Sequence, residues 1–257
     1  MNKLIPGIFN YCDRWCEKCD YRDRCRLFQT ETERNIQHIL NDEDPNDPEI
    51  VARDIKESLE DTLAMLEAQM EIEGVSKEDL EDFEDEDSKY FIDDFDDEQG
   101  EVTESGQIVR TPHPLSLLAD DFFKNVMAYF DKKKPSFYQN SEDDEPVNNP
   151  IYEELKILMW YSPQIAVKTR MCAGSKAKIE DVKDKDEIEF ETEMMNVNSR
   201  IAFTGIEKCL TSLQKIYDVE IDFQDDVLSL LALIKKMKVD FTAEFPAVHT
   251  FKRPYFD

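Results

Sequence analysis

The sequence predicts a mainly α protein: a helical bundle of about five helices with an N-terminal four-cysteine metal knuckle and long acidic loops. Glycine is scarce, at 6 of 257 residues, which argues against a many-turned β fold. In five segments apolar residues recur at spacings of three and four, the period of a helix with one buried face. Hydrophobic residues make up 40% of the chain, enough to form a core.

The first two helices follow the cysteine segment. Residues 26–40 read as a short helix, and a polar stretch with a proline ends it. Pro48 suits the first position of the next helix, and Asp47 can cap it. One apolar stripe then runs along that helix until it ends near Gly74: Val51, Ile55, Leu59, Leu63, Leu66 and Met70.

An acidic segment, residues 71–104, comes next. It holds 17 acidic residues and two lysines, a net charge of −15, which is more than half of the total. Such self-repulsion predicts a solvated loop. The alternative is that its apolar residues dock on a basic partner protein: Leu80, Phe83, Tyr90, Phe91, Ile92 and Phe95.

Two further helices open with prolines, at Pro114 and Pro150. The first ends at three lysines, which complement a helix C-terminus, and its apolar face comprises Leu115, Leu118, Phe122, Val126 and Tyr129. The second is expected to bend at Pro163 and to end at Gly174. Its apolar side comprises Ile151, Leu155, Leu158, Ile165 and Cys172.

The last two helices complete the predicted bundle. One carries Met194, Asn198, Ile201, Gly205, Cys209 and Ile216 on one face. Its small Gly205 and Ala202 allow a neighbouring helix to approach closely. The other begins near Gln224 and carries Val227, Leu230, Leu231, Ile234, Met237 and Phe241.

The order of the cysteine segment, the helices and the acidic stretches predicts a division of the chain at residue 40. Residues 1–40 form a four-cysteine metal-binding segment packed on the bundle, and residues 41–257 form the helical bundle. The bundle contains an acidic insert, residues 71–110, and two linkers, residues 132–149 and 174–190.

The net charge of −28 restricts the partners and the location. It repels phosphate backbones and anionic membrane surfaces, so neither nucleic acid nor a membrane is an expected partner. Pro6 and Gly7 interrupt the apolar start, which therefore lacks the continuous run of a signal peptide. No window approaches the roughly 18 apolar residues of a membrane span. A soluble, cytoplasmic protein is expected.

Four of the six cysteines lie within 14 residues, in the run YCDRWCEKCDYRDRC. In a reducing compartment such crowding favours metal ligation over disulfides. Two cysteines separated by two residues can turn both sulfurs toward one point, and the neighbours can complete a four-sulfur shell. The predicted metal ligands are Cys12, Cys16, Cys19 and Cys25.

The charges around these cysteines support an anionic centre. Four thiolates on zinc, or on an oxidised four-iron cluster, leave about two negative charges. The basic neighbours Arg14, Lys18, Arg22, Arg24 and Arg26 outnumber the acidic Asp13, Glu17, Asp20 and Asp23. This local excess of positive charge stands out in so acidic a chain.

The stretch CEKCDYRDRC resembles the Cys-x2-Cys-x5-Cys arm that binds a four-iron cluster in RecB-like nucleases and in WhiB-type regulators. The resemblance covers about a dozen residues and implies cluster-ligand roles for Cys16, Cys19 and Cys25. Those families bring their fourth cysteine from far upstream, whereas Cys12 is the candidate here. A four-iron four-sulfur cluster, zinc and no metal at all remain open, because both metal centres suit thiolates.

The other polar candidates are weaker. Cys172 and Cys209 lie on apolar faces and read as core residues, while the three histidines read as surface or loop residues. Polar groups on the third and fourth long helices could converge in a pocket inside the bundle: Lys168, Arg170, Asn196, Asn198 and Arg200. No phosphate loop, nucleophile elbow or paired-carboxylate motif indicates catalysis.

The sequence is therefore compatible with two functions. The first is a metal-binding interaction or regulatory module. The second is an iron–sulfur enzyme or electron-transfer protein that uses the polar pocket inside the bundle.

Overall fold

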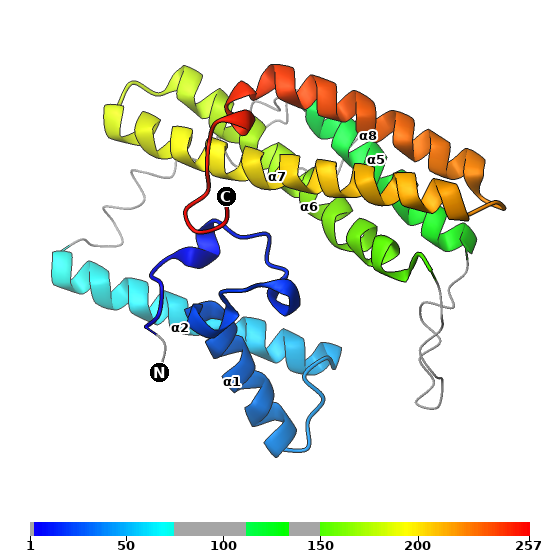
Figure 1. The fold of residues 1–257 in the computed structure, drawn as a ribbon. Coiled ribbons are helices and arrows are strands. Elements are labelled where there is room, and N and C mark those ends of the chain that lie inside the picture. The colour runs from blue at the N-terminus through cyan, green and yellow to red at the C-terminus, as the bar shows by residue number, and fades with distance from the viewer. Residues whose placement is uncertain (1–2, 75–111, 134–149) are drawn as a thin grey trace, which may run out of the picture. The chain divides into compact units, whose positions relative to one another are not determined.

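The computed structural model describes residues 3–74, 112–133 and 150–257. These residues contain six α-helices and no strand, which confirms the prediction of a mainly α protein (Figure 1). The chain divides into two compact units. One comprises Met1–Phe9 and Cys16–Arg110, and the other comprises Asn10–Trp15 and Thr111–Asp257. This division does not follow the expected boundary at residue 40.

The second unit is a four-helix bundle of α5 (Pro114–Lys133), α6 (Tyr152–Asp181), α7 (Lys185–Val219) and α8 (Gln224–Glu244). Helix α6 packs against α5 and α7, and α8 packs against the same two helices. The four helices thus form a closed ring around one core. A short 3-10 helix, η5 (Pro246–His249), packs on α7 and α8.

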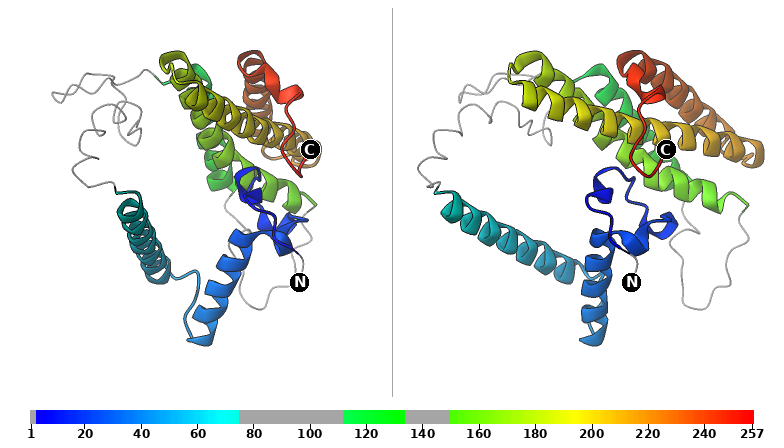
Figure 2. Two further views of the ribbon diagram at one scale, coloured as in Figure 1. Left: turned by 90° about the vertical axis from the view of Figure 1, so that its left-hand side faces the viewer. Right: turned by 60° about the vertical axis from the view of Figure 1, so that its left-hand side comes forward.

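Helices α6 and α7 make the longest contact of the bundle and lie alongside each other over most of their length (Figure 2). Gly205 of α7 faces two side chains of α6 at short range. A Cβ atom there would lie 3.1 Å from Ile165 Cγ1 and from Tyr161 Cδ1, so even a methyl group would require these side chains to shift by a few tenths of an ångström. The expectation that Gly205 allows close packing is confirmed.

The apolar faces predicted for the bundle helices form its core. Phe122, Leu158, Cys209 and Ile234 are fully buried, and all six predicted core residues of α8 are buried. Cys172 is fully buried too, which confirms both isolated cysteines as core residues. Burial raises the pKa of each of these two thiols, so both stay protonated at neutral pH.

The predicted linker at residues 174–190 is wrong. Helix α6 continues past Gly174 to Asp181, and α7 begins at Lys185. A Cβ atom at Gly174 would meet nothing within 4 Å, so this glycine serves no turn and costs the helix only about 1 kcal/mol. Asp184 caps α7 by accepting hydrogen bonds from the backbone N–H groups of Asp186 and Glu187, both at 3.0 Å.

The first unit contains α1 (Arg26–Leu40), α2 (Pro48–Glu73) and the 3-10 turns η2 (Cys16–Lys18) and η3 (Arg22–Arg24). Another turn, η1 (Ile8–Asn10), lies at the division between the units. The predicted ends of α2 are confirmed. Asp47 accepts a hydrogen bond from the Glu49 N–H at 2.8 Å, and Gly74 takes the left-handed φ of 71° that ends the helix.

A polar cluster, rather than an apolar one, joins α1 to α2. His38 is buried and bonds Glu43 through Nδ1 (2.8 Å) and Asp54 of α2 through Nε2 (3.0 Å). These hydrogen bonds raise the pKa of His38. Hydrogen bonds from Arg53 and then His38 lower the pKa of Glu43 to about 2. The expectation that His38 is a surface or loop residue is therefore wrong.

Most of the acidic insert predicted at residues 71–110, and most of the linker predicted at 132–149, lie outside the described residues. Among the helices that are described, none has the length and apolar character needed to span a membrane.

Candidate metal centre

The four predicted ligands belong to different parts of the structure. Cys16 opens η2, Cys19 follows that turn, and Cys25 immediately precedes α1, all in the unit that contains α1 and α2. Cys12 lies in the segment Asn10–Trp15, which belongs to the bundle.

The segment from Cys16 to Cys25 is folded by backbone hydrogen bonds. The Cys19 N–H donates to the Cys16 carbonyl (3.2 Å), and the Cys25 N–H donates to the Arg22 carbonyl (3.1 Å). The Ile5 N–H donates to the Arg24 carbonyl (3.0 Å), so the preceding stretch of chain is tied to η3. Two consecutive tight turns thus carry three cysteines.

One contact in this segment suits a metal-bound thiolate. The Tyr21 N–H donates to Cys19 Sγ at 3.4 Å, and backbone donors of this kind stabilise thiolate ligands. Cys25 is buried, whereas Cys16 and Cys19 are partly exposed. Within the described ranges, however, no three side chains of His, Cys, Asp or Glu are arranged so that they could hold a metal ion. The metal knuckle therefore stays a prediction.

On the bundle side, Asp13 anchors the segment that carries Cys12. Its backbone carbonyl accepts hydrogen bonds from Trp160 Nε1 (3.1 Å) and Gln164 Nε2 (2.6 Å). Its carboxylate accepts a hydrogen bond from the Tyr161 hydroxyl and lies 3.8 Å from Lys208 Nζ. Lys208 in turn donates to the Tyr161 hydroxyl oxygen at 2.6 Å. Four side chains from α6 and α7 therefore converge on one residue of the segment.

Trp15 provides the apolar part of this anchor. Its ring stacks on Trp160 with centroids 5.4 Å apart and meets the edge of Tyr161 at 5.7 Å. Trp15 is only 8% exposed and belongs to the bundle core. Arg14, between the two anchoring residues, adopts a left-handed φ of 59°, which costs a non-glycine residue about 1 kcal/mol. The contacts on either side hold this turn in place.

Lys168 of α6 has a pKa that its surroundings shift. Burial, and then the positive charge of Arg14, lower the pKa of Lys168. Cys172 and then Cys12 act in the opposite direction and raise this pKa. Burial, followed by the hydrogen bond to Asp13, raises the pKa of Tyr161, so its hydroxyl remains a donor.

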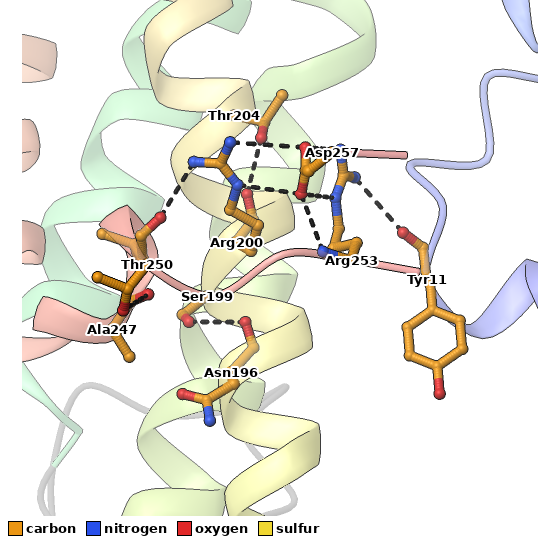
Figure 3. Close-up of polar contacts among 10 residues, drawn as sticks. Tyr11, Asn196, Ser199, Arg200, Thr204, Ala247, Thr250, Arg253 and Asp257 are labelled. Atoms are coloured by element: carbon orange, nitrogen blue, oxygen red, sulfur yellow. Dashed lines mark hydrogen bonds and ion pairs between the residues drawn. The ribbon is translucent and has the colours of Figure 1, made fainter. Parts of the chain in front are cut away.

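A second anchor comes from residues 251–257 (Figure 3). Arg253 donates to Asp257 and to the Tyr11 carbonyl, the latter at 3.4 Å, while Arg200 of α7 donates to Asp257 from the other side. Burial opposes ionisation of Asp257, but the hydrogen bonds from Arg253 and Arg200 hold its pKa well below the usual range. The Tyr11 hydroxyl also donates to Glu193 at 3.1 Å.

The polar residues expected to converge inside the bundle mostly do not. Lys168 donates to Asn198 Oδ1 at 2.9 Å, so this pair is brought together. Arg170 instead pairs with Asp120 at 2.8 Å, and Arg200 pairs with Asp257. The amide nitrogen of Asn198 is buried and has no hydrogen-bond partner within the part of the chain that the structure describes.

Sequence reasoning missed the roles of Asp13 and Trp15. The sequence shows Asp13 only as one of the acidic neighbours of the cysteines, whereas in the structure four side chains of the bundle contact it. A signal was present: a lone tryptophan among charged residues, in a segment with few other apolar side chains, needs a hydrophobic surface to cover it.

Comparison of the chain with protein-family models, with curated proteins and with solved structures gave no match.

Proposed function

We propose that this chain is a metal-binding interaction or regulatory protein in which Cys12, Cys16, Cys19 and Cys25 hold a four-iron four-sulfur cluster, with zinc as the alternative. The observation that carries the proposal is the crowding of four cysteines into 14 residues. The hydrogen bond from the Tyr21 N–H to Cys19 Sγ supports a thiolate there.

The bound group would link thiolates from a segment that has little core of its own. The chain's residues then act as ligands and as supports for those ligands. The Asp13 anchor restricts the backbone next to Cys12, and the turn at Cys16 restricts the backbone before Cys19. Basic residues around the cysteines offset the negative charge that four thiolates bring.

The test is metal analysis and absorption spectroscopy of protein purified without oxygen. An iron–sulfur protein is brown and contains iron and sulfide, whereas a zinc protein is colourless. Replacing any one of the four cysteines by serine is expected to lower the bound metal at least tenfold, because serine is a far poorer ligand for either metal at neutral pH.

The matched controls are Cys172→Ala and Cys209→Ala, which remove buried thiols outside the proposed centre. Both variants are expected to retain full metal content. Full metal occupancy in Cys16→Ser protein would defeat the assignment.

The second function, an iron–sulfur enzyme or electron-transfer protein, is favoured by one observation. Asn198 is 2% exposed, its oxygen accepts from Lys168, and its amide nitrogen has no acceptor among the described residues. Unsatisfied buried donors are rare, and a redox or catalytic role is one of the explanations for them. If this function holds, the purified protein undergoes reversible reduction, and Asn198→Ala shifts the midpoint potential. An unchanged potential would leave only the first function.

A further inference from the structure

Helix α2 displays an apolar stripe that no residue of the described ranges, 3–74, 112–133 and 150–257, buries. Val51, Ile55, Leu59, Leu63 and Leu66 are between 42% and 60% exposed. Scattered exposed leucines are ordinary on protein surfaces, but a continuous row along one helix face is typical of an interaction surface. We call these five residues the α2 stripe.

The spacing of the α2 stripe is that of a helix-pairing seam. Steps of three and four residues keep the side chains on one face over the whole helix. From Val51 to Leu66 the stripe extends for about 22 Å at the rise of an α-helix. A second helix of about 15 residues would cover it.

The charge of α2 determines which helix can do so. Between Pro48 and Glu73 it carries eight acidic and two basic residues. One of the two basic residues, Arg53, is hydrogen-bonded to Glu43 at 2.6 Å. The chain continues from α2 into the segment with a net charge of −15. A covering helix therefore meets a helix with a strong excess of negative charge.

We propose that the α2 stripe binds a basic amphipathic helix of a partner protein. Leucine-sized residues of the partner pack between Ile55, Leu59 and Leu63, and its lysines or arginines lie opposite the acidic residues of α2. A second copy of this chain fits less well, because pairing α2 with itself would set one acidic helix against another. This inference does not depend on the metal proposed above.

The probe is a synthetic helical peptide of about 20 residues, with leucine at the heptad seam and lysine elsewhere. Its counterpart has glutamate in place of every lysine. Binding to the 257-residue chain is measured by calorimetry. We expect the lysine peptide to bind and the glutamate peptide not to bind.

The decisive variant is Leu59→Ser/Leu66→Ser, which should weaken binding of the lysine peptide at least tenfold. Its matched control is Ala64→Ser/Ala68→Ser, which introduces the same residues on the opposite face and should bind as the parent does. Metal content should be equal in all three proteins.

Four results of the binding and stability measurements would overturn the proposal. They are a lysine peptide that does not bind, equal affinity of the stripe variant and the parent, binding of the glutamate peptide, and a loss of thermal stability in the stripe variant beyond that of its control. The last result would mean that the chain itself covers the stripe. Light scattering supplies a further check, because a dimer that the stripe variant abolishes would identify a second copy as the occupant and refute a foreign partner.

Discussion

The bundle helices and helix α2 have equally regular apolar patterns, but they differ in whether the apolar face is buried. In α8 the six predicted apolar residues are all buried, whereas the α2 stripe is exposed. Both helices satisfy the same rule of spacing. Periodicity therefore identifies the apolar face of a helix but does not reveal whether the folded chain covers that face.

The connections and the side chains explain the difference. Only Val182–Asp184 separates α6 from α7, and so short a connection makes the two helices antiparallel neighbours. Gly205 then lets them pack closely, and aromatic residues such as Phe122 fill the core. Helix α2 has no aromatic residue, and its contact with α1 runs through the charged groups around His38.

The sharpest test of this comparison applies one substitution to both regions. Leu158→Ala removes a fully buried side chain of α6 and is expected to lower the free energy of unfolding by about 2–5 kcal/mol. Leu59→Ala removes a 60% exposed side chain and is expected to change it by less than about 0.5 kcal/mol. Urea unfolding monitored by circular dichroism measures both. Equal losses would show that the α2 stripe is part of a core.

The second test asks whether residues 10–15 belong to the bundle in solution. Asp13→Ala leaves the buried Tyr161 hydroxyl without its acceptor and is expected to cost about 1–3 kcal/mol. Asp13→Asn keeps an acceptor and should restore part of that loss. Urea unfolding monitored by tryptophan fluorescence reports on the anchor, because Trp15 stacks on Trp160. If Asp13→Ala unfolds as the parent does, the segment is not anchored.

The third test concerns the polar contact between α1 and α2. The pKa of His38 is raised in the folded state, so protonated His38 stabilises the contact between α1 and α2. This stabilisation is complete below the unfolded pKa of about 6.5 and is lost as the pH rises through the raised pKa. The pKa of Glu43 is lowered to about 2, so its contribution is lost as the pH falls toward that value.

Hydrogen exchange of α1 amides should therefore be slowest in mildly acidic solution and should accelerate toward alkaline pH after correction for intrinsic exchange. In His38→Gln protein the alkaline acceleration should disappear. A parent protein whose corrected exchange is independent of pH would contradict the role given to His38.

The smallest effect is expected from shortening the acidic segment, residues 75–104. If it is a solvated loop, its removal leaves the bundle core intact and changes stability by only about 0.6 kcal/mol for each halving of its length. Thermal melts of the shortened and full chains, at low and high salt, measure this. A large loss on shortening would show that Phe83, Phe91 and Phe95 contribute to a core.

Much of the fold could be predicted because helix signals are local. Both ends of α2 could be predicted from Asp47, Pro48 and Gly74. The spacing of three and four residues between apolar positions identified the core faces of the four bundle helices. The end expected at Gly174 was wrong because helix-forming neighbours outweigh one glycine in the interior of a helix.

The candidate site could be predicted only in its residue types. The cysteine spacing indicates ligands, but the hydrogen bonds between Asp13 and α6 join residues 147 to 151 positions apart, and no local pattern encodes such a pairing. Of the residues expected in a polar pocket, only Lys168 and Asn198 contact each other. Arg170 and Arg200 instead pair with Asp120 and Asp257.

The Asp13 anchor also has a consequence for synthesis of the chain. Residues 10–15 leave the ribosome early, yet their docking surface is complete only when Lys208 of α7 has been made. At typical elongation rates of about 5–20 residues per second, the nascent segment spends about 10–40 s without that surface. During this interval the Trp15 ring lacks the bundle surface that buries it in the folded chain. Residues 10–15 therefore wait for the helices that hold them, and their anchoring is a late step of folding.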